Sequence, residues 1–173
     1  MEHEQDIVLR MSPAALYGSY SVALLVIVLD QISKWWVQGH FELYERVAIL
    51  PVFDFTLVYN EGAAWSFLSD AGGWQRWMFA AISAVVSVVI TVWIARLDRR
   101  QWYLRIGLIL ILGGAVGNLI DRLLLGKVVD FILVYYNESY FPAFNLADSA
   151  ITLGAGFLIL DMFFPLKVKV DDK

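Results

Sequence analysis

The chain has 173 residues, of which 60% are hydrophobic and 17% charged, and its mean hydropathy is +0.64. This apolar share exceeds that of ordinary soluble domains and predicts an integral membrane protein of one domain. The net charge of −4 argues against nucleic acid as a partner, and the absence of cysteine excludes disulfides, thiolate metal sites and a cysteine nucleophile.

Four apolar segments predict membrane-spanning helices, because about 20 apolar residues are needed to cross the hydrocarbon core of a bilayer. The first is interpreted as a retained helix rather than a secretory signal, since Asp30 and Lys34 stand where a small-residue cleavage site would be expected. The segments cover residues 14–37, 75–95, 102–124 and 147–164.

The basic residues predict how these helices are oriented, because cytoplasmic loops carry an excess of Lys and Arg. With the N-terminus in the cytoplasm, eight of the 13 basic residues would lie inside and five outside. The short basic loop at residues 96–100 carries most of this difference. We therefore expect both termini in the cytoplasm, and residues 38–74 and 125–146 on the outer side of the membrane.

The first outer segment has the pattern of a small sheet. Arg46–Leu50 and Phe53–Tyr59 are rich in β-branched and aromatic residues and flank a turn at Pro51, which predicts two short strands. Residues 63–68 then predict a short amphipathic helix resting on the membrane surface, with Trp65 as an interfacial anchor. The predicted fold is a mainly α membrane protein: a four-transmembrane-helix bundle with a small extracytoplasmic β-sheet and a short interfacial helix.

Several polar residues lie inside the apolar segments. Asp30 and Lys34 are four residues apart in the acid-before-base order that favours pairing on a helix, so we expect a structural ion pair near the membrane surface. In the third segment, Asn118 and Arg122 share one helical face and Asp121 points to another. They could pair within the bundle or line a site; for Asp121 we expect a structural role.

Asp130 and Asp148 each lie where a membrane surface should begin, in the sequences VVDFI and FNLADS. If the two carboxyl groups converge, they cannot both ionise cheaply, so they share a proton and can activate water for hydrolysis of a peptide bond. On spacing alone the signal is weak, and two solvated loop acids remain the alternative.

The polar motifs, taken together, resemble those of the bacterial lipoprotein signal peptidases (signal peptidase II), aspartic proteases of the inner membrane. They occur in that family's order from about residue 14 to 165. The matching motifs are Asp30-Gln-Ile-Ser-Lys34, Asn60-Glu-Gly-Ala-Ala-Trp-Ser-Phe67, Gly113-Gly-Ala-Val-Gly-Asn-Leu-Ile-Asp-Arg122, Val128-Val-Asp-Phe131 and Phe144-Asn-Leu-Ala-Asp-Ser149.

The resemblance implies a role for each polar residue. Asp130 and Asp148 would be catalytic, and Asp30, Lys34 and Asp121 would support the structure. The residues implied to hold the substrate backbone or a globomycin-type inhibitor are Asn60, Asn118, Arg122 and Asn145. The segment 135–141 is implied to form a flap over the site.

The resemblance also implies the setting of the reaction. The substrates would be prolipoproteins modified with diacylglycerol, cleaved just before the lipid-bearing cysteine, with membrane lipid around the site. We expect no metal and no cofactor, a monomer, and a multi-pass protein of the bacterial inner membrane whose active site lies near the periplasmic face.

Two other functions are compatible with parts of the sequence. A small transporter coupled to protons or cations could use the same acids, but it predicts acids spread through the depth of the membrane. A scaffold protein could use the polar residues to join helices, in which case changing Asp130 or Asp148 to an amide would lower stability more than activity.

Overall fold

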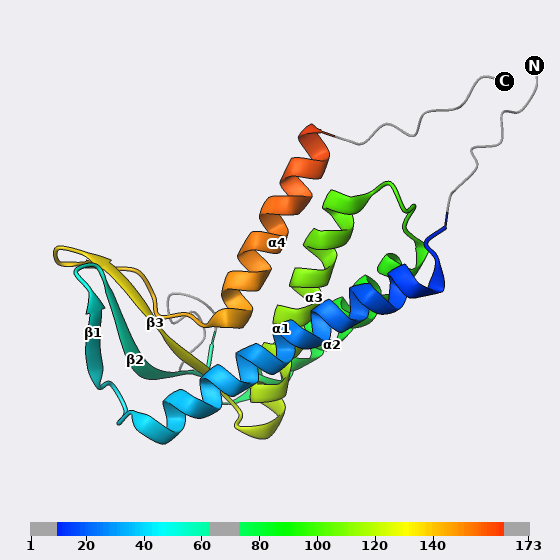
Figure 1. Cartoon of the computed structure of the whole chain (residues 1–173). Coiled ribbons are helices and arrows are strands. Elements are labelled where there is room, and N and C mark those ends of the chain that lie inside the picture. The colour runs from blue at the N-terminus through cyan, green and yellow to red at the C-terminus, as the bar shows by residue number, and fades with distance from the viewer. Residues whose placement is uncertain (1–9, 63–72, 165–173) are drawn as a thin grey trace, which may run out of the picture.

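The computed structural model describes residues 10–62 and 73–164. Within these residues four helices form a bundle, and a sheet projects from one end of it (Figure 1). Each of the four is long and apolar enough to cross a membrane, as the sequence predicts. The interfacial helix predicted at residues 63–68 lies outside the described residues. The helices are α1 (Pro13–His40), α2 (Trp74–Arg96), α3 (Trp102–Leu124) and α4 (Leu146–Phe163).

The helices follow the predicted segments closely. The largest difference is in α1, which continues three residues beyond the predicted Val37 to His40. This helix begins at Pro13, after the N-cap residue Ser12, whose side chain accepts a hydrogen bond from the Ala15 amide. The outward faces remain strongly apolar, with exposed side chains that include Leu24, Val85, Val88 and Ile159. Such faces suit contact with lipid rather than with water.

Helix α3 lies at the centre of the bundle and packs against the other three helices. Glycines allow the close approach. A Cβ atom added at Gly114 would collide with the Ala147 carbonyl oxygen of α4, and one at Gly113 would lie 2.7 Å from the Val26 Cβ of α1. Small residues at these positions are typical of membrane helix interfaces. They bring the polar end of α3 against α1 and α4.

The described residues form a four-stranded antiparallel sheet in the order β1-β2-β3-β4. The predicted strand pair is confirmed as β1 (Arg46–Leu50) and β2 (Phe53–Asn60). The sequence prediction missed β3 (Val128–Tyr136) and β4 (Ser139–Tyr140), which it treated as a connection containing a flap. β3 and β4 form a hairpin, and β3 pairs with β2 along most of its length.

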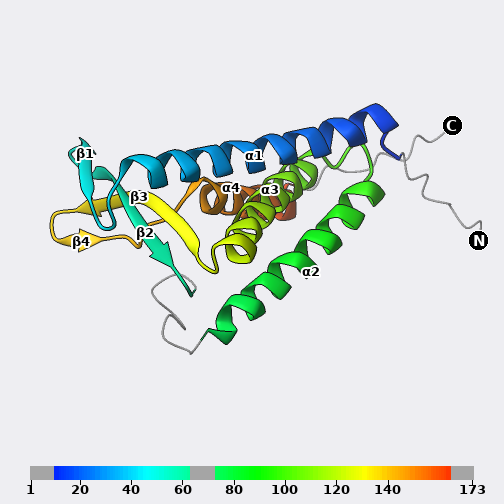
Figure 2. The ribbon, with the colours of Figure 1, turned by 90° about the horizontal axis from the view of Figure 1, so that it is seen from below.

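The sheet lies where three helix ends meet. The C-terminal ends of α1 and α3 and the N-terminal end of α4 face the sheet (Figures 1 and 2). Between α3 and β3 the chain turns at Gly126, whose φ of +79° favours glycine. The strand that carries Asp130 and the helix that carries Asp148 therefore start from the same region of the molecule.

Candidate active site

Asp130 lies on β3, where the strand passes between β2 and the start of α4. Its carboxyl group is buried, with 2% of the residue exposed, and it accepts two hydrogen bonds. Asn145 Nδ2 donates to Oδ1 over 2.7 Å, and Asn60 Nδ2 donates to Oδ2 over 3.1 Å. The side-chain amides that flank the acid thus come from β2 and from the α4 cap.

Asp148 is the third residue of α4, and Asn145 is the N-cap. The two residues form a capping box, in which Asn145 Oδ1 accepts from the Asp148 amide over 2.9 Å and Asp148 Oδ2 accepts from the Asn145 amide over 3.2 Å. Asn118 Nδ2 of α3 donates to Asp148 Oδ1 over 2.8 Å. A carboxylate in the first turn of a helix is stabilised by the helix dipole.

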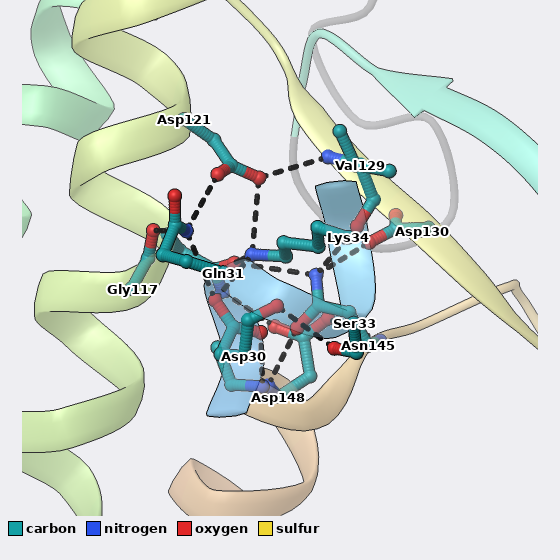
Figure 3. Close-up of polar contacts among 12 residues, drawn as sticks. Asp30, Gln31, Ser33, Lys34, Gly117, Asp121, Val129, Asp130, Asn145 and Asp148 are labelled. Atoms are coloured by element: carbon teal, nitrogen blue, oxygen red, sulfur yellow. Dashed lines mark hydrogen bonds and ion pairs between the residues drawn. The ribbon is translucent and has the colours of Figure 1, made fainter. Parts of the chain in front are cut away.

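Two asparagines link the acids. Asn145 Nδ2, which binds Asp130, also lies 3.2 Å from Asn118 Oδ1, and Asn118 in turn binds Asp148. Figure 3 shows Asn145 with the two acids. The acids therefore belong to one hydrogen-bond network, although they are eighteen residues apart in sequence. They are also close enough for the charge of Asp148 to act on Asp130. The convergence of Asp130 and Asp148, which their spacing left open, is present.

The surroundings of Asp130 favour its neutral form. Burial, followed by the negative charge of Asp148, raises the pKa of Asp130 to about 7, while the hydrogen bonds from Asn60 and Asn145 and the charge of Lys34 act in the opposite direction. A carboxyl group with a pKa near neutrality, beside an acid held at a helix N-terminus, has the asymmetry required of a general acid and a general base.

The acids open into a cavity of about 600 Å³. Both carboxyl groups line it, and so do three of the residues implied to bind substrate: Asn60, Asn118 and Arg122. The remaining walls are largely apolar and come from Gly62 after β2, from β3, from the 141–144 segment and from α4. Their residues are Gly62, Val128, Phe141, Pro142, Ala143, Phe144, Ser149, Ile151, Thr152 and Leu153.

Asn145 differs from the other residues implied to bind substrate. It has no exposed surface, and its side chain is bonded to both halves of the acid pair and to the Val129 carbonyl oxygen. Its place in the structure is between the two carboxyl groups, behind the cavity wall. Local sequence could have indicated this, because Asn145 and Asp148 have the spacing of a capping box.

Arg122 carries a positive charge to the cavity from the last turn of α3. Its guanidinium group lies 3.4 Å from the carbonyl oxygens of Asn118 and Gly62 and 5.3 Å from the centre of the Phe79 ring. Arg76 of α2 donates to the Arg122 carbonyl oxygen over 2.8 Å, which holds the end of α3. Arg122 and Asn118 share one face, as predicted.

The residues implied to support the structure lie together beneath the acid pair. The expected ion pair is present, with Lys34 Nζ 2.8 Å from Asp30 Oδ2, but both residues are buried at no more than 1% exposure. Asp121 joins them, with Oδ2 3.0 Å from Lys34 Nζ. Sequence analysis missed Gln31, whose Nε2 lies 2.9 Å from Asp121 Oδ1 and 3.2 Å from Asp30 Oδ2.

The predicted flap segment has two parts. Tyr135 pairs with Tyr140 across the β3–β4 hairpin, and the turn contains Asn137 with a φ of +52°. Phe141 then leads into the cavity wall.

No group of three or more His, Cys, Asp or Glu side chains within residues 10–62 and 73–164 could hold a metal ion.

Comparison with known proteins gives a consistent result. A family model described as "Signal peptidase (SPase) II" matches residues 22–164. The chain is 55% identical to the lipoprotein signal peptidase of Shewanella halifaxensis over 154 residues, which cover 89% of each chain. It is 57% identical to that of Pseudomonas fluorescens over 148 residues, covering 84% of this chain and 87% of the relative.

The fold is also similar to that of solved structures. One, described as a bacterial membrane enzyme, has a TM-score of 0.79 and 26% sequence identity, covering 96% of this chain and 98% of that chain. A second bacterial membrane enzyme has a TM-score of 0.73 and 27% identity, covering 96% and 99%.

Proposed function

This chain belongs to the signal peptidase II family, bacterial membrane proteases that remove the signal peptide from prolipoproteins, and from this premise we propose that Asp130 and Asp148 are its catalytic pair. The observation that carries the proposal is the pair itself. Two carboxyl groups from different elements share one amide network and open into one cavity. One is buried, and the other is at a helix N-terminus.

The proposed reaction assigns different roles to the two acids. Ionised Asp148 takes a proton from water while the water oxygen attacks the scissile carbonyl carbon, and neutral Asp130 gives its proton to the carbonyl oxygen. When the resulting diol collapses, the C–N bond breaks, the leaving nitrogen takes the proton from Asp148, and a diol hydroxyl returns a proton to Asp130. The burial that favours neutral Asp130 supports this assignment, as does the place of Asp148 in the first turn of α4.

The cavity offers two kinds of contact to a substrate. Asn60 and Arg122 present polar groups beside the acids and are proposed to hold the substrate backbone, with Asn118 beside them. The apolar walls, which include Ile151 and Phe141, are proposed to receive the lipid of a diacylglyceryl-modified cysteine, with cleavage just before that residue. The same cavity would take globomycin-type inhibitors. For Asn145 we propose an indirect role, because it is fully buried.

The protein is a multi-pass bacterial membrane protein, and we propose that the sheet and the cavity face the periplasm. The asymmetry of basic residues supports this orientation, with both termini in the cytoplasm. The structure brings the predicted outer elements to one end of the bundle (Figure 1). The proposed chemistry needs one copy of the chain and neither a metal nor a cofactor.

The distribution of acids bears on the alternative of a transporter. Such a protein predicts acids spread along the membrane-spanning segments. Here Asp30, Asp121, Asp130 and Asp148 belong to one connected cluster at the sheet end of the bundle, which favours hydrolysis at one site.

The test is the separate replacement of Asp130→Asn and Asp148→Asn, with cleavage of a lipid-modified precursor as the measurement. Each variant should fold and lose nearly all activity, by at least about 1,000-fold, because each removes a proton carrier. Asp161→Asn, an acid-to-amide change later in α4, is the matched control and should cleave at the parent rate. A well-folded Asp130 or Asp148 variant with parent activity would overturn the assignment.

A further inference from the structure

Lys34 is a buried cation whose ammonium group lies directly behind the proposed catalytic pair. Its side chain is 2% exposed. Three acceptors surround Nζ: Asp30 Oδ2 at 2.8 Å, Asn118 Oδ1 at 2.9 Å and Asp121 Oδ2 at 3.0 Å. Figure 3 shows Lys34 with Asp30 and Asp121. An ammonium group has three N–H donors and no acceptor, so each donor has one partner here.

The two acids bound by Lys34 each reach the backbone next to one catalytic residue. Asp30 Oδ1 accepts from the amide of Ala147 over 2.9 Å, immediately before Asp148. Asp121 Oδ2 accepts from the amide of Val129 over 3.1 Å, immediately before Asp130. The cluster therefore ties α1 and α3 to the backbone positions from which both catalytic side chains extend.

Lys34 also fixes the orientation of a side chain that touches the pair. Because Lys34 Nζ can only donate, the atom of Asn118 that faces it must be the oxygen. The Asn118 Nδ2 group is then directed to Asp148 Oδ1, 2.8 Å away. Asn145 Nδ2 donates to the same oxygen over 3.2 Å, so Lys34 and Asn145 together disfavour the reversed amide, which would place an oxygen against the Asp148 carboxylate.

Stability alone does not account for such a cluster. Ionised, Asp30, Lys34 and Asp121 carry a net charge of −1, and burying charged groups costs several kcal/mol per ion before their pairing is counted. Buried ion clusters can often be replaced by apolar residues of similar volume with little loss of stability. This cluster is distinguished by its hydrogen bonds to the Val129 amide, the Ala147 amide and the Asn118 side chain, because each of these groups lies next to Asp130 or Asp148.

We propose that Lys34 is a positioning residue of the catalytic pair: through Asp30, Asp121 and Asn118 it holds both carboxyl groups at the separation and orientation that hydrolysis requires. This inference rests on the proposed function of Asp130 and Asp148. It goes beyond a supporting role in the fold, because it assigns to Lys34 an effect on turnover that is separate from its effect on stability.

The first test is Lys34→Met, which keeps the length of the side chain and removes the charge. We expect kcat to fall about 100-fold with little change in KM, since a displacement of about 1 Å in a catalytic group has an effect of this size. Arg105→Met is the control, because it removes a charged group near the start of α3, at the end away from the sheet, where its guanidinium group lies 3.4 Å from the Met11 sulfur. It should retain parent kcat.

The pH profile separates positioning from a general structural effect. The charged groups around the pair are Lys34 and Asp30 from α1 and Arg122 and Asp121 from α3, and the charge of Lys34 lowers the pKa of Asp130. Removing that charge should therefore raise the pKa of Asp130 and move the loss of activity at alkaline pH to higher pH. A purely structural lysine would leave this limb of the profile in place.

A second test keeps every charge. A Cβ atom added at Gly117 would lie 2.6 Å from Asp30 Oδ2, so Gly117→Ala displaces the cluster without removing a group. Gly113→Ala, one turn earlier, adds the same methyl group 2.7 Å from the Val26 Cβ and leaves the cluster untouched. At a similar loss of melting temperature, Gly117→Ala should lower kcat about 10-fold more than Gly113→Ala.

The outcomes are distinguishable. Active Asp130→Asn would overturn the proposed function and this inference with it. If Asp130→Asn is inactive while folded Lys34→Met keeps parent kcat and the parent alkaline limb, the inference alone fails. If Lys34→Met does not fold, equal kcat in the two glycine variants would overturn it, and the expected difference between them would support it.

Discussion

Asn145 Nδ2 lies 2.7 Å from Asp130 Oδ1, and the same asparagine is the N-cap of the helix that carries Asp148. One side chain thus begins α4 and sets the distance between the acids of the proposed pair. The position of Asp148 along its helix and the environment of Asp130 on its strand are determined together, because both depend on where Asn145 is held.

Asn145→Ser should separate the two roles of this residue. Serine keeps an N-cap oxygen for the Asp148 amide, so α4 should keep its stability within about 0.5 kcal/mol. It lacks the amide donor to Asp130, so kcat should fall by about 10-fold to 100-fold. Thermal unfolding and precursor cleavage measure the two effects. Asn145→Ala, which loses the cap as well, should be less stable by about 1 kcal/mol. Parent activity in the serine variant would contradict the role given to Nδ2.

The pH dependence of cleavage should show the proton of Asp130. Its pKa is about 7, raised by burial and by Asp148, and the proposed reaction needs the neutral form. The rate should therefore decline as pH rises above about 7, by about tenfold per unit once Asp130 is mostly ionised. Because the acids are coupled, the apparent value describes the pair. A rate that stays constant to about pH 9 in a protein that remains folded would exclude neutral Asp130 as the acid.

The same carboxyl group should make stability depend on pH. Its pKa is higher in the folded protein, about 7, than the ordinary aspartate value of 3.8, so near neutral pH the folded state holds a proton that the unfolded chain has released. This stabilising contribution is fully present below about pH 4 and is lost as pH rises through about 7, for a total of about 4 kcal/mol. Asp130→Asn cannot lose this proton. Between pH 5 and pH 8 the melting temperature of the parent should therefore fall relative to that of Asp130→Asn. The melting temperature of Asp161→Asn should fall in parallel with that of the parent.

The sequence was sufficient to predict the four apolar helices and the β1–β2 pair, because both patterns are local. Length and apolar composition identify a spanning helix, and β-branched runs around Pro51 identify a hairpin. The ion pair of Asp30 and Lys34 was predictable for the same reason, since the two residues lie one helical turn apart.

The missed features depend on contacts between distant parts of the chain. β3 is a strand because it pairs with β2, so that Val58 lies opposite Asp130, seventy-two residues later. The contact between Lys34 and Asp121 likewise joins α1 to α3, and no local pattern distinguishes it from a pair that never meets. The convergence of Asp130 and Asp148 has the same origin, which is why family motifs and not spacing identified it.

The packing of α3 against α4 gives a last prediction, on stability without chemistry. A Cβ atom at Gly154 would lie 2.7 Å from the Gly107 carbonyl oxygen and 2.7 Å from the Ile111 Cγ1, so Gly154→Ala should force the helices apart. We expect a loss of about 1–3 kcal/mol in the free energy of unfolding, as for other overpacked interiors. Gly156→Ala, on the same helix, has no atom within 4 Å of the new methyl group and should be neutral or slightly stabilising. Thermal unfolding of both variants in the same detergent makes the comparison. Equal stability of the two would show that α4 can move away from α3 without cost, and the position of Asp148 would then depend on its polar contacts rather than on helix packing.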